Sequence, residues 1–373
     1  MTQTDVVDPE RAAVRLGRER RRIFLVSTLV GLAAPVVPYV TGAWETAWYA
    51  FAQTWLPLPL RAAIFLLGFH AVLSLILLPF SFYSRYLLAH SFGLSRQSLR
   101  SWAVDWLKGA GLGVTFGSLA AGAYLLTLAV AEDRWWVAYA TLLSVVTLVL
   151  AFVTPYVLVP LFFRMRPLQD RATVERIQSL VARAGTRVRD ICTLDFSQRT
   201  VEANAAVIGL GQSRRVVLAD TLLSEFEPAE VDAIVAHELG HHVHRDVQKL
   251  LVGYLVTIWL GLAIAGILGP RALPLLSVPY LGYVPGYPVL LAVAELYLLL
   301  FTPLTNWWSR RLESAADRFA LRLTRDPSAF AAAMRRLAHQ NLSELRPPRW
   351  AELLLGSHPA LFRRIQMAER WQA

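Results

Sequence analysis

The chain has 373 residues, of which 55% are hydrophobic and only 17% are charged, and its mean hydropathy is +0.43. These values exclude an ordinary soluble domain and indicate a membrane protein. The net charge of +10 does not indicate nucleic-acid binding, because the arginines flank apolar segments instead of lining one soluble domain. The single cysteine, Cys192, excludes an internal disulfide.

Six segments are long and apolar enough to cross a bilayer. The first follows an arginine-rich stretch and has no small-residue cleavage site, so we expect a retained anchor and not a signal peptide. Pro303 is expected to kink the last segment. In chain order, the predicted spans are Ile23–Val40, Ala62–Phe82, Leu112–Ala131, Trp136–Phe162, Leu250–Leu268 and Val289–Trp307.

Basic residues are distributed unevenly between the connecting segments. Six arginines lie between Arg11 and Arg22, whereas residues 41–60 contain Glu45 and no lysine or arginine. Arginine is frequent again after Phe163 and near the C-terminus. By the positive-inside rule, these three regions face the cytoplasm in a multi-pass protein of the cell membrane, where anionic lipids are expected partners. The predicted division is 1–163 with four membrane helices, 164–249, 250–308 with two membrane helices, and 309–373.

The first soluble part is predicted to contain a small sheet. A helix is expected over Arg171–Ala184, followed by short strands at Ile191–Phe196, Ala205–Leu210 and Arg215–Ala219. Such a sheet offers an edge on which an extended peptide can pair. Asn204 opens the middle strand, where its side chain either holds a substrate carbonyl or ends a turn.

The most informative motif is His237-Glu238-Leu239-Gly240-His241, an HExxH pattern. A helix repeats every 3.6 residues, so His237 and His241 share a face and can bind one metal ion. Glu238 is placed to act on water at that ion. The motif therefore predicts a zinc-dependent hydrolase, while His242 and His244 are expected to lie on the surface.

A catalytic zinc site needs a third protein ligand. Glu313 and Asp317 lie four residues apart on one predicted helix face, so one carboxylate could bind the metal while the other accepts a histidine N–H. The alternative is an exposed charged helix in which nearby arginines are the partners of these acids. His358 precedes Pro359 at a helix entrance, and its side chain either faces a pocket or lies on the surface.

Several motifs in the same order resemble the type I CAAX prenyl endopeptidases, a family of integral-membrane zinc metallopeptidases. The likeness extends from about Leu78 to Ile365 and therefore does not rest on one motif. The segments that carry it are Leu78-Pro79-Phe80, Ser91-Phe92-Gly93-Leu94-Ser95, Leu161-Phe162, Pro167-Leu168, Asn204-Ala205, Gly209, Val216–Leu222, His237–His241, Ser309–Arg311 with Glu313 and Ala316-Asp317, and Ser357-His358-Pro359 with Arg364.

The resemblance implies a mainly α-helical, polytopic membrane protein, in which about six helices here enclose a chamber beside a cytoplasmic, gluzincin-like metalloprotease domain. That domain, formed by 164–249 and 309–373, carries the small sheet. One Zn²⁺ per chain is implied. The implied roles are metal binding by His237, His241 and Glu313, acid–base catalysis by Glu238, support of a ligand by Asp317, substrate pairing by Asn204 and Ala205, and contact with the oxyanion or the substrate by His358 and Arg364.

Two differences from the eukaryotic members concern the substrate. They have seven spans, whereas six are predicted here, and His242 replaces a tryptophan. We expect a monomeric endopeptidase that cleaves membrane-associated peptides or proteins, with or without a lipid group. The alternatives are a quality-control protease that acts on misfolded membrane proteins, and a non-catalytic scaffold whose zinc is held by four protein ligands.

Overall fold

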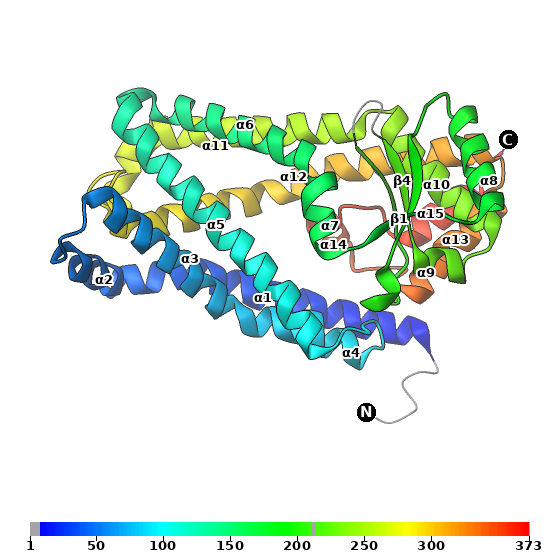
Figure 1. The fold of residues 1–373 in the computed structure, drawn as a ribbon, viewed down its shortest axis with the longest axis horizontal. Coiled ribbons are helices and arrows are strands. Elements are labelled where there is room, and N and C mark those ends of the chain that lie inside the picture. The colour runs from blue at the N-terminus through cyan, green and yellow to red at the C-terminus, as the bar shows by residue number, and fades with distance from the viewer. Residues whose placement is uncertain (1–7, 210–213, 373) are drawn as a thin grey trace.

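The computed structural model describes residues 8–209 and 214–372. Within them, five continuous helical stretches are long and apolar enough to cross a membrane. They extend from a compact end that carries the sheet, and both ends of the described chain lie at that end (Figure 1). The five stretches are Pro9–Val40, Leu58–Ser91, Leu99–Phe162, Asp246–Leu276 and Val284–Thr324.

The third stretch has 64 residues and contains two antiparallel helices. Helix α5 (Leu99–Ala131) ends at a turn formed by Glu132–Arg134, where Glu132 has a φ of 44°. Helix α6 (Trp135–Val153) then returns along α5. The fourth and fifth stretches contain α11 (Asp246–Ala272) and α12 (Tyr287–Thr324). All six predicted spans fall within these stretches.

Helix α1 (Pro9–Val40) begins well before the first predicted span. Asp8 caps its N-terminus by accepting hydrogen bonds from two backbone N–H groups, and proline occupies the first helical position. Its 32 residues make it about 48 Å long, which exceeds the roughly 30 Å of hydrocarbon in a bilayer. The basic first half packs on the compact end, where both Nη atoms of Arg21 donate to Glu344.

The sheet has four strands in the order β1-β2-β4-β3. The two central strands are parallel, and each outer strand is antiparallel to its neighbour. Three of the four strands lie where the sequence predicts them, and β1 was not predicted. Leu210, the predicted end of the middle strand, lies outside the described residues. The strands are β1 (Met165–Pro167), β2 (Asp190–Leu194), β3 (Ala205–Ile208) and β4 (Arg215–Ala219).

The largest hydrophobic core lies between this sheet and the helices around it. Leu218 of β4, Leu239 of α10, Leu321 of α12 and Phe330 of α13 are all fully buried there. The core therefore fixes α10 against the sheet on one side and against the end of α12 on the other. The helices of this part are α8 (Arg171–Arg183), α9 (Asp220–Glu225), α10 (Pro228–Val243), α13 (Pro327–Gln340), α14 (Arg349–Leu354) and α15 (Leu361–Glu369).

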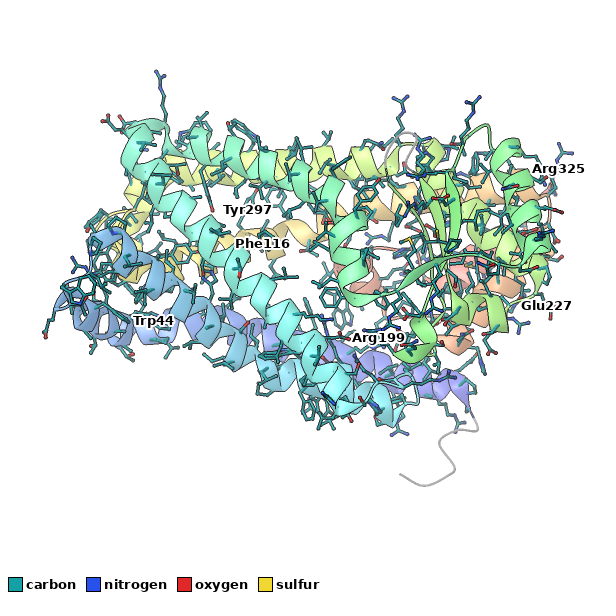
Figure 2. The ribbon with its side chains drawn as sticks, in the orientation of Figure 1. Trp44, Phe116, Arg199, Glu227, Tyr297 and Arg325 are labelled. Atoms are coloured by element: carbon teal, nitrogen blue, oxygen red, sulfur yellow. The ribbon has the colours of Figure 1, made fainter. Side chains whose placement is uncertain are left out.

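The remaining helices are short, and they complete the part formed by the long helices. Figure 2 shows Phe116 and Tyr297 along that part, with Trp44 at the end farthest from Glu227 and Arg325. A cavity of about 680 Å³ lies between α3 (Leu58–Phe82) and α5 and reaches Arg199. A chamber enclosed by all the long helices stays a prediction. The short helices are α2 (Ala43–Ala52), α4 (Ala89–Ser91) and α7 (Val159–Phe162).

Candidate active site

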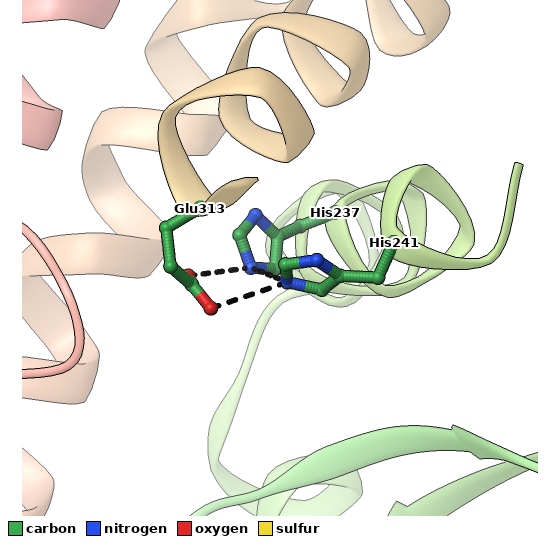
Figure 3. Close-up of side chains that lie close together, drawn as sticks. All are labelled: His237, His241 and Glu313. Carbon is green, nitrogen blue, oxygen red and sulfur yellow. Dashed lines mark hydrogen bonds and ion pairs between the residues drawn. The ribbon is translucent and has the colours of Figure 1, made fainter. Parts of the chain in front are cut away.

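Helix α10 places the two histidines of the HExxH motif on one face. Glu227 and Glu230 form a capping box at its N-terminus, which fixes where the helix begins. His237 and His241 then lie one turn apart, and their Nε2 atoms are 3.1 Å from each other (Figure 3). The buried His237 faces inward, toward α12.

Glu313 approaches the same point from α12. Its Oε2 lies 3.3 Å from His237 Nε2, and its Oε1 lies 3.3 Å from His241 Nε2 (Figure 3). The ligand atoms of these three residues all lie within 4.8 Å of one another, and the carboxylate is buried. Of the two arrangements that the sequence left open, the structure has the converging one and not an exposed charged helix.

Each histidine also contacts a second carboxylate through its other ring nitrogen. His237 Nδ1 lies 2.8 Å from Asp317 Oδ1, and His241 Nδ1 lies 3.0 Å from Asp246 Oδ2. Carboxylates in this position orient a metal-binding imidazole and fix its tautomer. Asp246 was not predicted. Its sequence signal is weak: an acidic residue three positions after the end of α10, in the first turn of α11.

The charges around this point fit a metal cation. If each Nδ1–H donates to its carboxylate, each neutral ring carries a lone pair on Nε2, and the two lone pairs face each other at 3.1 Å. Glu313 Oε2 is buried beside them and makes no hydrogen bond. Three electron-pair donors without a proton between them are stable only around a cation. Two histidines and one carboxylate are a ligand set typical of catalytic zinc.

Without a metal, protons take its place. Burial lowers the pKa of His241, but hydrogen bonds to Asp246 and Glu313 outweigh burial and raise this pKa to about 10. The imidazole is then protonated at neutral pH, although metal binding requires the neutral ring. Metal binding must therefore release protons and weaken as the pH falls.

Two further predicted residues lie at the same site. Glu238 is half-buried next to the paired imidazoles, and burial raises the pKa of its carboxyl although the imidazoles oppose the shift. His358 Nε2 lies 3.2 Å from Glu313 Oε1, while the side chain of His358 is 60% exposed. Ser357 Oγ lies 2.9 Å from His358 Nδ1 and orients the ring. His358 therefore borders both the ligand carboxylate and the solvent.

Arg364 lies behind the site. Its Nη2 and Nε donate to Asp317 at 2.6 and 2.9 Å, and its side chain is buried. The same Nη2 lies 3.3 Å from His237 Nδ1. In this structure Arg364 therefore holds the Asp317 carboxylate in place. Contact between Arg364 and a substrate stays a prediction.

Asn204 and Ala205 lie where β3 begins, at the outer edge of the sheet. Asn204 is exposed, and its Oδ1 accepts a hydrogen bond of 2.9 Å from the N–H of Ala205. Both residues line a mostly apolar cavity of about 350 Å³ together with Phe163 and Phe196. The side chain of Asn204 thus contacts the neighbouring backbone, and its contact with a substrate stays a prediction.

Gly240 allows α10 and α12 to approach closely. A Cβ atom at this position would lie 3.1 Å from the Cα and 3.2 Å from the carbonyl oxygen of Ala316, which are backbone atoms and cannot move aside independently. We expect Gly240→Ala to separate the histidines from Glu313 and to weaken zinc binding about tenfold, since overpacking costs about 1–3 kcal/mol. Competition with a zinc chelator measures the effect. Gly253→Ala is the control, because a Cβ there meets nothing within 4 Å; equal zinc affinity in both variants would contradict the prediction.

Comparison with known proteins agrees with this geometry. Residues 167–372 match the model of peptidase family M48, and residues 6–164 match a model described as the CAAX prenyl protease N-terminal region with five membrane helices. The metalloprotease YhfN of Bacillus subtilis is 30% identical over 314 residues, which cover 81% of this chain and 73% of that protein. The probable CAAX prenyl protease 1 of Schizosaccharomyces pombe is 28% identical over 199 residues, or 52% of this chain and 41% of that protein.

The fold also matches a solved structure. The crystal structure of Ste24p from S. mikatae aligns with a TM-score of 0.85 and covers 97% of this chain and 89% of that chain, at 21% sequence identity. The mainly helical, multi-pass membrane architecture with a small mixed sheet is therefore confirmed. The family matches and the HExxH site together show that the chain belongs to peptidase family M48, as a membrane metallopeptidase related to the CAAX prenyl proteases.

Proposed function

We propose that this protein is a zinc metalloendopeptidase that hydrolyses peptide bonds of membrane-associated peptides at the cytoplasmic face of the cell membrane. The convergence of Glu313 on the paired imidazoles of His237 and His241 carries the proposal. The domain that does this is assembled from residues 164–249 and 309–373, and it acts as a monomer with one zinc ion.

Three converging ligands favour catalysis over a structural role. Among the described residues, the group that could hold a metal contains two histidines and one glutamate, which leaves a coordination position open. A structural zinc site would have four protein ligands. A zinc ion in this position would polarise the scissile carbonyl and lower the pKa of the attacking water.

Glu238 is assigned the proton transfers. Its carboxylate takes a proton from the attacking water and delivers it to the leaving amine. The raised pKa of Glu238 suits both steps, because the carboxyl can hold the proton between them. His358 is assigned hydrogen bonding to the oxyanion, since it is the exposed group beside the ligand carboxylate. Arg364 is a positioning residue that acts through Asp317.

The free edge of β3 is assigned to substrate binding. The N–H of Ala219 donates to the carbonyl of Asn204 at 2.9 Å, which sets the alternation of the antiparallel ladder. Ala206 therefore pairs with β4, whereas the backbone groups of Ala205 and Val207 face away from it. The N–H of Ala205 already donates to Asn204 Oδ1. An extended peptide can pair with the carbonyl of Ala205 and with the N–H and carbonyl of Val207, along the sheet edge beside α10.

Val207→Pro tests this edge. Proline removes one outward N–H and leaves the ladder to β4 intact, so we expect KM to rise about fivefold, as the loss of about 1 kcal/mol of hydrogen bonding predicts. Steady-state kinetics on a fluorogenic peptide measure the change. Val207→Ala keeps the N–H and serves as the control. A KM for the proline variant equal to that of the alanine variant would argue against pairing at Val207.

Cleavage assays with the purified chain test the function as a whole. We expect a lipidated peptide ending in a CAAX sequence to be cut, the activity to disappear on chelation, and zinc to restore it. The alternative, a quality-control protease, predicts faster cleavage of unfolded casein. The match of residues 6–164 to the CAAX prenyl protease N-terminal model supports the first substrate class. Activity that persists after complete removal of zinc would refute the mechanism.

A further inference from the structure

A positively charged cavity lies along α12, beside α14. It has a volume of about 460 Å³ and opens between α12, α14 and the start of α15. The α12 residues that line it are spaced three and four apart, so they share one helix face. They are Trp307, Arg310, Arg311 and Ser314, and the other lining residues are Arg349, Glu352, Leu353, Pro359 and Arg363.

Two of the four arginines in this cavity have local partners. Arg310 Nη1 donates to the carbonyl oxygens of Glu352 and Gly356 at 2.9 and 2.5 Å, which holds the chain after α14 against α12. Arg363 Nε lies 3.2 Å from Glu352 Oε1. The single carboxylate of the cavity is therefore already neutralised.

The other two arginines are exposed and available to a ligand. Arg311 stacks over the ring of Trp307 at 4.3 Å, which orients its guanidinium without neutralising it. Neither Arg311 nor Arg349 forms an ion pair with a carboxylate in the part of the chain that the structure describes. Two oriented guanidinium groups at one cavity match the oxygens of a phosphate group.

The cavity lies at the level where α12 leaves its apolar stretch. Trp307 and Trp308 are 43% and 48% exposed and lie just before Arg310, separated from it by one serine, as interfacial tryptophans do at a membrane surface. Helix α14, which lies where the long helices meet the sheet (Figure 1), exposes three more large apolar side chains. These are Trp350, Leu353 and Leu354.

We propose that this cavity binds the head group of an anionic phospholipid. The phosphodiester contacts Arg311 and Arg349, while the acyl chains lie along the exposed apolar side chains of α12 and α14. A lipid fits better than a soluble phosphate, because the arginines border an apolar surface that a soluble ligand would leave exposed to water. None of the three converging ligands lines this cavity, so the proposal does not depend on the proposed catalytic mechanism.

Native mass spectrometry of the full chain in detergent tests the proposal, with phosphatidylglycerol and phosphatidylcholine as probes. We expect retained phosphatidylglycerol in the wild type and about 25-fold weaker binding in Arg311→Gln/Arg349→Gln, because each arginine near an anionic lipid contributes a factor of about five. The control is Arg318→Gln/Arg322→Gln, which removes two exposed arginines from the same helix outside the cavity. Zinc content and thermal unfolding establish that each variant is folded.

Four results would overturn the lipid site. Binding of phosphatidylglycerol could be equal in the Arg311→Gln/Arg349→Gln variant and the wild type, or it could fall as far in the control. Phosphatidylcholine could bind as tightly as phosphatidylglycerol. Finally, glycerol phosphate could bind with the same affinity and the same dependence on the two arginines, which would assign the cavity to a soluble phosphate instead.

Discussion

Glu238→Gln should reduce kcat by about 10²- to 10⁴-fold, the range that a positioned general acid–base contributes. Glutamine has nearly the same shape as glutamate but cannot take the proton of the attacking water. Zinc binding should stay unchanged, because the converging ligand atoms belong to His237, His241 and Glu313. Peptide cleavage and zinc content, measured on the same preparation, give both results.

The control is Glu175→Gln, an equal loss of charge on the exposed face of α8. It should retain full activity and full zinc content. Undiminished cleavage by Glu238→Gln would remove Glu238 from the mechanism. Loss of zinc together with activity would mean instead that Glu238 supports the metal, and the acid–base assignment would fail in that case as well.

Glu313→Gln should lose zinc, and Asp317→Asn should only weaken its binding. The Glu313 carboxylate supplies one of three converging donors and one negative charge, whereas Asp317 acts through the Nδ1–H of His237. Loss of such an outer partner costs about 10- to 100-fold in metal affinity, and loss of a ligand should cost more. Chelator competition measures both affinities.

Asp246→Asn extends this series to the second histidine. It should behave like Asp317→Asn, since Asp246 contacts His241 Nδ1 in the equivalent way. Thermal unfolding distinguishes loss of metal from loss of fold. If Glu313→Gln binds zinc as tightly as Asp317→Asn, Glu313 is not a ligand, and the site lacks a third donor among the residues described.

Periodicity along the chain made much of this protein predictable. The apolar spans, the HExxH helix and the strand Arg215–Ala219 follow from spacing within one segment, because backbone hydrogen bonding fixes a repeat of 3.6 or 2 residues. The same local rule placed Glu313 and Asp317 on one helix face. It could not decide whether that face met the histidines or the solvent.

Periodicity within a segment does not predict the contacts between distant segments. Asp246 reaches His241 because Arg245, with a φ of 58°, turns the chain sharply between α10 and α11. Arg364 reaches Asp317 from another helix, 47 positions away. Neither residue has a spacing that identifies its partner. Asp246 was therefore not predicted, and the family resemblance implied only that Arg364 contacts the oxyanion or the substrate.

Local patterns along the chain are enough to show that it crosses a membrane several times and that two imidazoles share one helix face. Which carboxylate meets them, and which acids contact their outer nitrogens, depends on how the folded helices pack. Helix geometry is set by neighbours within one or two turns, and it can therefore be derived from spacing. The meeting of α10 and α12 depends on a packed core and on the missing side chain of Gly240, which no periodic pattern encodes.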